Sequence, residues 1–373
     1  MGPGARMRLG LVVNPVAGLG GRVGLKGSDG ADVQARARAL GARSRAGERA
    51  ALALEELRSR LGGGITVRTA AGAMGADAVV AAGLTPEVCH TPGSPTTPSD
   101  TVRAAAALAS RVDLLLFAGG DGTARDILDA VGPSVPVLGV PTGVKMHSAV
   151  FGVSPRAAGE AAALMAAGGV PLREAEVMDL DEDAVRGGRV SARLYGYLRV
   201  PDIPVRVQQR KMGGTVTSPA SVSGIAADLA ARPGPSGLLV LGPGGTTRAI
   251  AAVLGADVPV MGVNVLAGGR VAAADVSAAE LEALVGASPA WIAVTPIGGQ
   301  GFLLGRGNQQ ISPDVLRAAG RDRLIVVATE AKLASLGGRP LLVDTGDEKL
   351  DDDLRGHLPV LTGHGSTAMY PVR

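Results

Sequence analysis

The chain has 373 residues, which is too long for one compact core and predicts two domains of roughly 100–200 residues each. Hydrophobic residues make up 46% and charged residues 19%, a balance that excludes intrinsic disorder. Only 2% of the residues are aromatic, and the net charge of +3 is spread over 37 Lys and Arg against 34 Asp and Glu, so we expect no nucleic-acid partner.

The cysteine content and the apolar runs predict the compartment. Cys89 is the single cysteine, which excludes an intramolecular disulfide and any zinc site built from several cysteines. The first apolar run, 9–13, is too short for the core of a signal peptide, and Arg6 stands where a myristoylation motif has Ser or Thr. Since no apolar stretch of 18 residues marks a membrane span, we expect a cytoplasmic protein with no membrane partner.

The first half of the chain alternates short apolar runs with helical patterns. Strands are predicted at 7–13, 65–69, 78–82, 112–118 and 135–140. Helices are predicted at 48–61, from Ser99 or Asp100 to about 111, and at 123–131. This alternation predicts parallel pairing in a doubly wound layer.

The pattern changes after about residue 175. Strands are predicted at 177–180, 190–200, 204–210, 324–329 and 341–344, and the Gly-rich tail at 359–373 is expected to be irregular. The acidic run 347–353 is interpreted as a solvated surface, with a metal site as the alternative. We therefore place domain boundaries after residues 175 and 330.

The chain contains an internal similarity. When 122–140 is shifted by 123 residues onto 245–263, ten of the nineteen positions are identical. Both copies follow an apolar strand and predict a strand, a glycine loop, a short helix and a returning strand. Duplication is the preferred explanation. The copies differ in that Asp121 of the first loop corresponds to Gly244 of the second.

The loop Gly119-Gly120-Asp121-Gly122-Thr123 carries the residues most suited to chemistry. Its glycines allow close backbone approach, and exposed N–H groups beside a helix N-terminus favour a phosphate. Asp121 would repel a phosphate, so it is interpreted as a metal holder or as the acceptor of a proton from an attacking hydroxyl. The alternative is that Asp121 simply caps the following helix.

The same loop resembles the signature of the superfamily that joins NAD kinases to diacylglycerol and sphingosine kinases. Asn14-Pro15 with Gly18 resembles its N-terminal nucleotide loop, and the stretch from Thr295-Pro296-Ile297-Gly298 to Ser312-Pro313 is similar to the NAD-kinase segment that begins Thr-Pro-Thr-Gly. Segments 20–30 and 141–148 are similar to a divergent bacterial and archaeal branch of ATP-NAD kinases that includes the acetoin-catabolism protein X group. The resemblance covers most of the chain from about residue 8 onward.

This resemblance implies an α/β plus β fold. A Rossmann-like, doubly wound kinase domain would bind nucleotide in 1–175, a β-rich domain with the second glycine loop would bind the acceptor in 176–330, and 331–373 would pack back on the first domain. Asp121 would be the catalytic residue that deprotonates the adenosine ribose 2′-hydroxyl of NAD. Mg²⁺ is expected with ATP, and the partners would be ATP or polyphosphate and NAD, in a homo-oligomer.

Two further groups of residues are expected at the site. Phosphate and nucleotide binding is assigned to Asn14, Gly119, Gly120, Gly122, Thr123, Arg125, Asp126 and Lys145. Acceptor binding is assigned to Thr295, Pro296, Gly298, Gly299, Gln300 and Phe302. Arg125 is included because a positive charge in the first turn opposes the helix dipole unless an anion lies nearby. Asp126 stands where the lipid kinases of the superfamily have a glutamate.

Several other residues could be functional or structural. Lys145 is a phosphate clamp or a surface lysine, and His147 is interpreted as structural rather than functional. Cys89 beside His90 is a loop cysteine rather than a thiolate nucleophile, while Lys26 and Asp29 lie in a Gly-rich loop suited to binding.

The sequence departs from the NAD-kinase pattern in two places, both of which concern binding of the acceptor. Gly299-Gln300-Gly301-Phe302 stands where NAD kinases have Ser-Thr-Ala-Tyr, and the second domain has no clear Asn-Glu pair at the start of a strand. Three functions therefore stay open: an NAD kinase, a kinase of another alcohol such as a lipid or polyol, and a non-catalytic nucleotide-binding regulator.

Overall fold

The computed structural model describes residues 7–25, 30–62, 65–144, 146–180, 192–203, 207, 219–234, 236–297 and 300–373. The chain forms two compact units, one of residues 1–19, 28–34 and 43–210 and one of residues 20–27, 35–42 and 211–373, which share helix α1 (Ala31–Ala39). The first unit extends past the expected boundary at 175. The reason is that β6 (Leu172–Leu180) and β7 (Ala192–Pro201) form an antiparallel ribbon, and their apolar residues join the first hydrophobic core.

A parallel five-stranded sheet with the order β3-β2-β1-β4-β5 lies at the centre of the first unit. Its strands are β1 (Leu9–Val13), β2 (Thr66–Ala70), β3 (Thr85–His90), β4 (Leu114–Gly119) and β5 (Val137–Pro141). Every residue of β1, β4 and β5 is buried, as expected for strands that are covered on both faces. The winding reverses between β1 and β4, and open α/β sheets bind ligands beyond the carboxyl ends of the strands at such a point.

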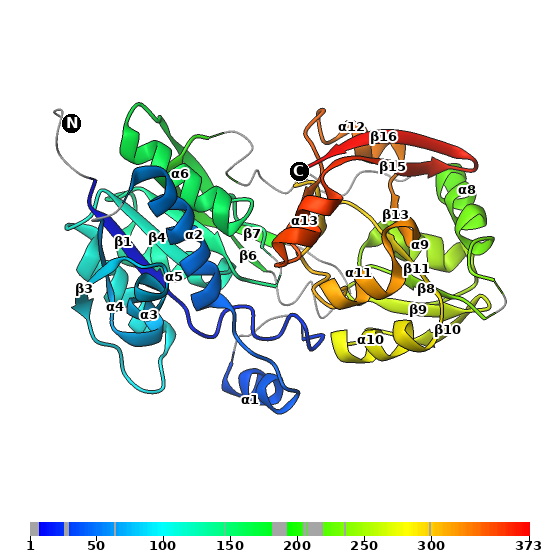
Figure 1. Ribbon diagram of the computed structural model, residues 1–373, viewed down its shortest axis with the longest axis horizontal. Helices are drawn as coiled ribbons and strands as arrows, with labels where there is room; N and C mark the ends of the chain where they lie inside the picture. The colour runs from blue at the N-terminus through cyan, green and yellow to red at the C-terminus, as the bar shows by residue number, and fades with distance from the viewer. Residues whose placement is uncertain are drawn as a thin grey trace. The chain divides into compact units, whose positions relative to one another are not determined.

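Helices pack on this sheet in two groups (Figure 1). The helices are α2 (Ala46–Leu61), α3 (Ala76–Ala81), α4 (Pro98–Ala109), α5 (Asp121–Val131) and α6 (Pro155–Ala167). α2 packs against α3 and α6, and α4 packs against α5, as right-handed crossovers require of a doubly wound layer. The predicted fold of this unit is confirmed.

One edge of the first sheet differs from the prediction. The run 78–82, expected to be a strand, belongs to helix α3, and the edge strand is β3, which the sequence pattern did not indicate. Periodicity cannot assign so short an apolar run, and the largely exposed β3 lacks the apolar character of a buried strand.

The second unit contains a mixed seven-stranded sheet with the order β10-β9-β8-β11-β13-β15-β16. Its strands are β8 (Leu238–Leu241), β9 (Asn264–Ala267), β10 (Arg270–Ala273), β11 (Ala290–Val294), β13 (Leu324–Val327), β15 (Gly356–Gly363) and β16 (Ser366–Val372). β8, β11, β13 and β15 run parallel, and the outer strands pair antiparallel. β12 (Phe302–Leu304) and β14 (Leu342–Val343) form a separate parallel pair.

Both faces of the second sheet are covered, and alternate residues of its strands enter different cores. Leu239 and Leu241 of β8 pack with residues of α8 (Pro219–Ala230) and α9 (Gly245–Val253). Leu238 and Val240 pack on the opposite face with residues of α10 (Ala278–Ala287) and α11 (Pro313–Ala319). The expected β-rich second domain is confirmed, with a mixed sheet whose two faces are covered by helices.

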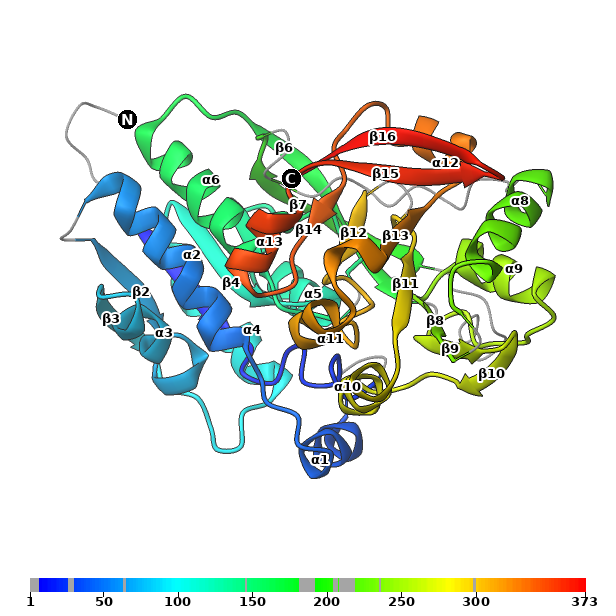
Figure 2. The ribbon, with the colours of Figure 1, turned by 45° about the vertical axis from the view of Figure 1, so that its right-hand side comes forward.

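The tail also differs from the prediction. The segment 359–373, expected to be irregular, forms most of the hairpin of β15 and β16, seen side by side in Figure 2. β15 pairs with β13 and buries Leu358, Val360 and Leu361, so this part of the tail belongs to the second unit. The acidic run lies in α13 (Glu348–Leu354), where Asp347 is the N-cap and pairs with Arg317.

The internal similarity is only partly structural. β4 with α5 and β8 with α9 each form a strand, a glycine loop and a helix. The returning segments differ, since β5 lies parallel to β4, whereas 258–263 forms no strand and β9 pairs antiparallel with β8. Among the described residues, no helix has both the length and the apolar character needed to cross a bilayer.

Candidate active site

Three loops meet at the carboxyl ends of β1, β4 and β5. The backbone N–H of Asn14 donates to the carbonyl of Ala118 at 2.9 Å, and the Asn14 side-chain amide donates to Thr123 Oγ1 at 3.0 Å. The backbone N–H of Thr142 donates to the Gly119 carbonyl at 3.0 Å. The structure thus brings together Asn14 and the 119–123 loop, which lie far apart in the sequence.

The glycines of these loops are required by packing between loops. A Cβ on Gly119 would lie 2.3 Å from the Thr123 Cβ, and a Cβ on Gly143 would lie 2.8 Å from the Gly120 Cα. Gly18 has a φ of +74°, and a Cβ there would lie 2.0 Å from the Thr142 carbonyl oxygen. These positions exclude larger residues before any ligand is considered.

Asp121 is the first residue of α5, and Gly120 is the N-cap. The Asp121 carboxylate does not cap the helix. Oδ2 accepts from the His147 backbone N–H at 2.7 Å and lies 3.3 Å from His147 Nδ1, while Oδ1 accepts from the Ser148 backbone N–H at 3.0 Å. The side chain is 11% exposed. The alternative interpretation, a helix cap, is therefore not what the structure shows.

The remaining residues of the loop and of α5 differ in their surroundings. Thr123 is buried, and its hydroxyl accepts from Asn14, so a ligand at this loop would meet backbone N–H groups rather than that side chain. Arg125 lies over the Tyr195 ring of β7, 6.0 Å from its centroid, and Asp126 is half-buried on the same helix. Gly122 follows Asp121 in the first turn of α5.

Sequence reasoning did not single out Thr142. This residue directly follows β5 and is 8% exposed, and its hydroxyl has no hydrogen-bond partner among the residues that the structure describes. A buried hydroxyl without a partner is costly, which is typical of a group that a ligand or water satisfies. The only sequence signal for Thr142 as a site residue is its position directly after an apolar strand.

The acceptor stretch lies in the second unit, after β11. Thr295 and Pro296 are buried, and the Lys332 ammonium donates to Thr295 Oγ1 at 2.8 Å and to Thr246 Oγ1 at 3.3 Å. Gln300 is buried as well. Phe302 is 1% exposed beneath the Arg306 guanidinium, so its ring supports this region from within the core.

Thr246 belongs to the second glycine loop. It corresponds to Thr123 of the first loop, so equivalent hydroxyls accept from an amide in one unit and from an ammonium in the other. Lys332 had no sequence signal, because it lies on α12 (Glu330–Ala334), outside every motif.

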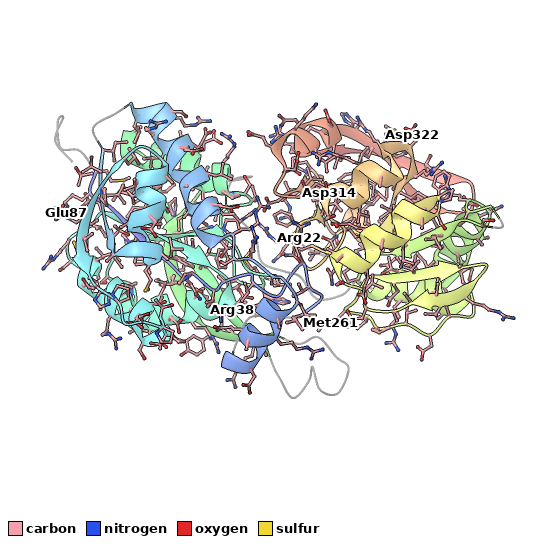
Figure 3. All side chains as sticks on the ribbon, turned by 60° about the horizontal axis from the view of Figure 1, so that its bottom comes forward. Arg22, Arg38, Glu87, Met261, Asp314 and Asp322 are labelled. Carbon is pink, nitrogen blue, oxygen red and sulfur yellow. The ribbon has the colours of Figure 1, made fainter. Side chains whose placement is uncertain are left out.

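Several expected residues lie elsewhere or outside the described part of the chain. Lys26, Asp29, Lys145, Gly298 and Gly299 lie outside the described residues. In the Gly-rich loop, Arg22, which is labelled in Figure 3, belongs to the second unit. Its carbonyl accepts from the Ala278 N–H at 2.8 Å, and its guanidinium pairs with Glu282 at 3.3 Å. Cys89 is a half-exposed residue of β3.

Comparison with known families decides the assignment. The model of the ATP-NAD kinase N-terminal domain matches residues 9–170, and the model of the ATP-NAD kinase C-terminal domain matches residues 237–372. The chain belongs to the ATP-NAD kinase family. It is a phosphotransferase of that family, and its two-domain architecture is the family's own.

Other comparisons add little to the family assignment. A search among curated proteins finds no match. A solved structure of a Bacillus anthracis strain Sterne protein, provisionally described as a diacylglycerol kinase, is 16% identical, covers 45% of each chain and has a TM-score of 0.23. A match at that level gives no further information on the fold or the function of this ATP-NAD kinase family member.

Proposed function

We propose that this protein transfers a phosphoryl group from ATP to the 2′-hydroxyl of the adenosine ribose of NAD, forming NADP. The observation that carries the proposal is the position of Asp121. Asp121 stands at the start of α5, at the switch point of the parallel sheet and beside the loop that follows β1. Its carboxylate accepts from the backbone N–H groups of His147 and Ser148, which hold it in place. The family assignment supports the acceptor and the donor.

In the proposed reaction the acceptor hydroxyl oxygen forms a bond to the γ-phosphorus. The bond from that phosphorus to the β–γ bridging oxygen breaks, and ADP leaves with the electron pair. The hydroxyl proton passes to the Asp121 carboxylate, and a positioned base of this kind accelerates such a step by about 10²–10⁴-fold.

The donor would be bound mainly by backbone groups. The first N–H groups of α5 have no partner within the helix, and the helix end is positive, so they suit phosphate oxygens. Gly120 and Gly122 are half-buried and carry no side chain that could cover these N–H groups, and the Thr142 hydroxyl would add one side-chain donor. Asn14 would act by holding Thr123 and hence the loop.

Mg²⁺ arriving with ATP would neutralise phosphate charge. In the described ranges of the chain, no three His, Cys, Asp or Glu side chains gather at one point. Phosphate oxygens would therefore supply most of the ligands, with Asp126 as the carboxylate on α5 that could join them.

On the acceptor side, the proposed binding residues are Thr295, Pro296 and Gln300, all of which are buried. The Lys332 ammonium, held on Thr295, places a positive charge at this stretch, which suits the diphosphate of a dinucleotide. The family's serine and threonine are replaced by Gly299 and Gln300, and this loss of hydroxyls favours a second candidate, a kinase of another alcohol.

One experiment separates these functions. The purified chain is incubated with MgATP, or with polyphosphate, and separately with NAD, NADH, a polyol mixture and a short-chain diacylglycerol, and phosphorylated products are identified by mass spectrometry. NADP formation that requires NAD and a phosphoryl donor supports the proposal. A product from another alcohol alone supports the second candidate, and nucleotide binding without any product supports a non-catalytic regulator.

A further inference from the structure

His147 contacts Asp121 through its imidazole ring as well as through its backbone N–H. The loop that carries His147 is already held by backbone groups, since the Ser148 N–H donates to Asp121 and the Ala149 N–H donates to the Glu176 carbonyl at 2.8 Å. Ser148 Oγ also accepts from the Met178 N–H at 2.9 Å. The imidazole ring is an additional element, 95% buried, with Nδ1 3.3 Å from Asp121 Oδ2.

This contact makes the two carboxylate oxygens of Asp121 inequivalent. Oδ2 faces two nitrogen atoms of His147, the backbone N–H and ring Nδ1, whereas Oδ1 accepts only from the Ser148 N–H among the residues that the structure describes. A carboxylate oxygen accepts about two hydrogen bonds. Oδ2 is therefore filled by the protein, and Oδ1 keeps capacity for one more donor.

The contact also selects a form of the imidazole. An unprotonated Nδ1 would set its lone pair against the carboxylate, so a proton on Nδ1 is required for attraction. His147 then donates to Oδ2 in the neutral Nδ1–H tautomer or as the imidazolium.

We propose that His147 is a positioning residue for Asp121, whose Nδ1–H holds Oδ2 and leaves Oδ1 as the atom that takes the acceptor's hydroxyl proton. The inference rests on the proposed function. His147 would restrict the rotation of the Asp121 carboxylate. This matters because misplacement of a base lowers the rate of proton transfer more than it lowers substrate binding.

The test compares three substitutions. His147→Asn keeps an N–H donor at the δ position, His147→Leu removes it, and His364→Leu is the matched control because His364 also pairs with an aspartate, Asp228, but is 78% exposed. We expect His147→Leu to lower kcat by about 10–100-fold, as when a group that orients a catalytic ligand is lost. KM for ATP should change less than about twofold, His147→Asn should recover most of kcat, and His364→Leu should resemble wild type.

A second readout does not depend on turnover. In protein labelled with ¹⁵N-histidine, the long-range ¹H–¹⁵N spectrum of His147, assigned with His147→Asn, should show a proton on Nδ1, and Asp121→Asn should change that pattern. A wild-type kcat in His147→Leu, or a neutral His147 protonated on Nε2, would overturn the inference. If wild type forms no product, the proposed function fails, and the spectrum still decides whether the contact exists.

Discussion

The side-chain amide of Asn14 donates to the hydroxyl of Thr123 across 109 residues of chain, with 3.0 Å between the two atoms. This bond joins the end of β1 to the first turn of α5, and the Thr123 side chain that it holds fills the space that a side chain at position 119 would need. The two halves of the proposed nucleotide site are thus one packed unit, and disturbing either should affect both stability and donor binding.

Thr123→Val tests that bond. Valine matches the shape of threonine but leaves the Asn14 amide without its acceptor, so the free energy of unfolding should fall by about 1–3 kcal/mol. Thr123→Ser keeps the hydroxyl and should retain more of the affinity for ATP. Chemical denaturation and nucleotide titration measure both effects, and equal ATP affinity in the two variants would show that the bond does not shape the site.

Gly119→Ala tests the requirement for glycine at the end of β4. The new methyl group would lie within 2.3 Å of the Thr123 Cβ, which should destabilise the protein by about 1–3 kcal/mol or more. Gly47 of α2 is the matched control because an added Cβ there meets no atom within 4 Å, so Gly47→Ala should stabilise by about 0.4–1 kcal/mol. Thermal unfolding of the two variants should shift in opposite directions, and a shift in the same direction would contradict the packing argument.

Thr142→Val should separate stability from binding. Because the buried hydroxyl has no partner among the described residues, its removal should leave the free energy of unfolding unchanged or raise it by up to about 1 kcal/mol. The same change should weaken ATP binding about three- to tenfold through the loss of one hydrogen bond. Calorimetric titration with MgATP measures the affinity, and a loss of stability with unchanged affinity would assign Thr142 a structural role.

Lys332→Met tests the proposed positive charge on the acceptor side. Methionine keeps the apolar stem but cannot donate to Thr295 or Thr246, so KM for the acceptor should rise about tenfold while KM for ATP stays near its original value. Lys349→Met removes an equal charge from an exposed position on α13 and serves as the control. Equal effects of the two substitutions on acceptor KM would point to net charge rather than to Lys332.

Much of the first unit could be predicted from sequence because its buried parallel strands are continuous apolar runs and its helices have clear periodicity. β3 and α3 could not, since an exposed edge strand and a six-residue helix carry little pattern. The β15–β16 hairpin was missed because its glycines and prolines suggested an irregular tail, while its strand character comes from pairing with β13, a contact between distant segments.

The candidate site was predictable to the same degree. The glycine loop indicated Asp121 directly, and the loop after β1 indicated Asn14. The partners of Asp121 were not predictable, because the contact with His147 and Ser148 depends on how the loop after β5 folds back on α5. These contacts also mean that Asp121→Asn changes stability as well as chemistry. Because each carboxylate oxygen accepts from a backbone N–H, the NH₂ group of asparagine would face one of these donors, which should cost about 1–3 kcal/mol of stability.

The role of Asp121 as the base is tested by the rate of phosphoryl transfer from MgATP in Asp121→Asn, measured as product per enzyme at a temperature where thermal unfolding shows the variant to be folded. Asp129→Asn is the control, since Asp129 lies on the same helix and its exposed carboxylate contacts only the Tyr195 hydroxyl among the described residues. A role for Asp121 as the base predicts a loss of about 10²–10⁴-fold in turnover for Asp121→Asn and a wild-type rate for Asp129→Asn. Product formation by folded Asp121→Asn at the wild-type rate would contradict it.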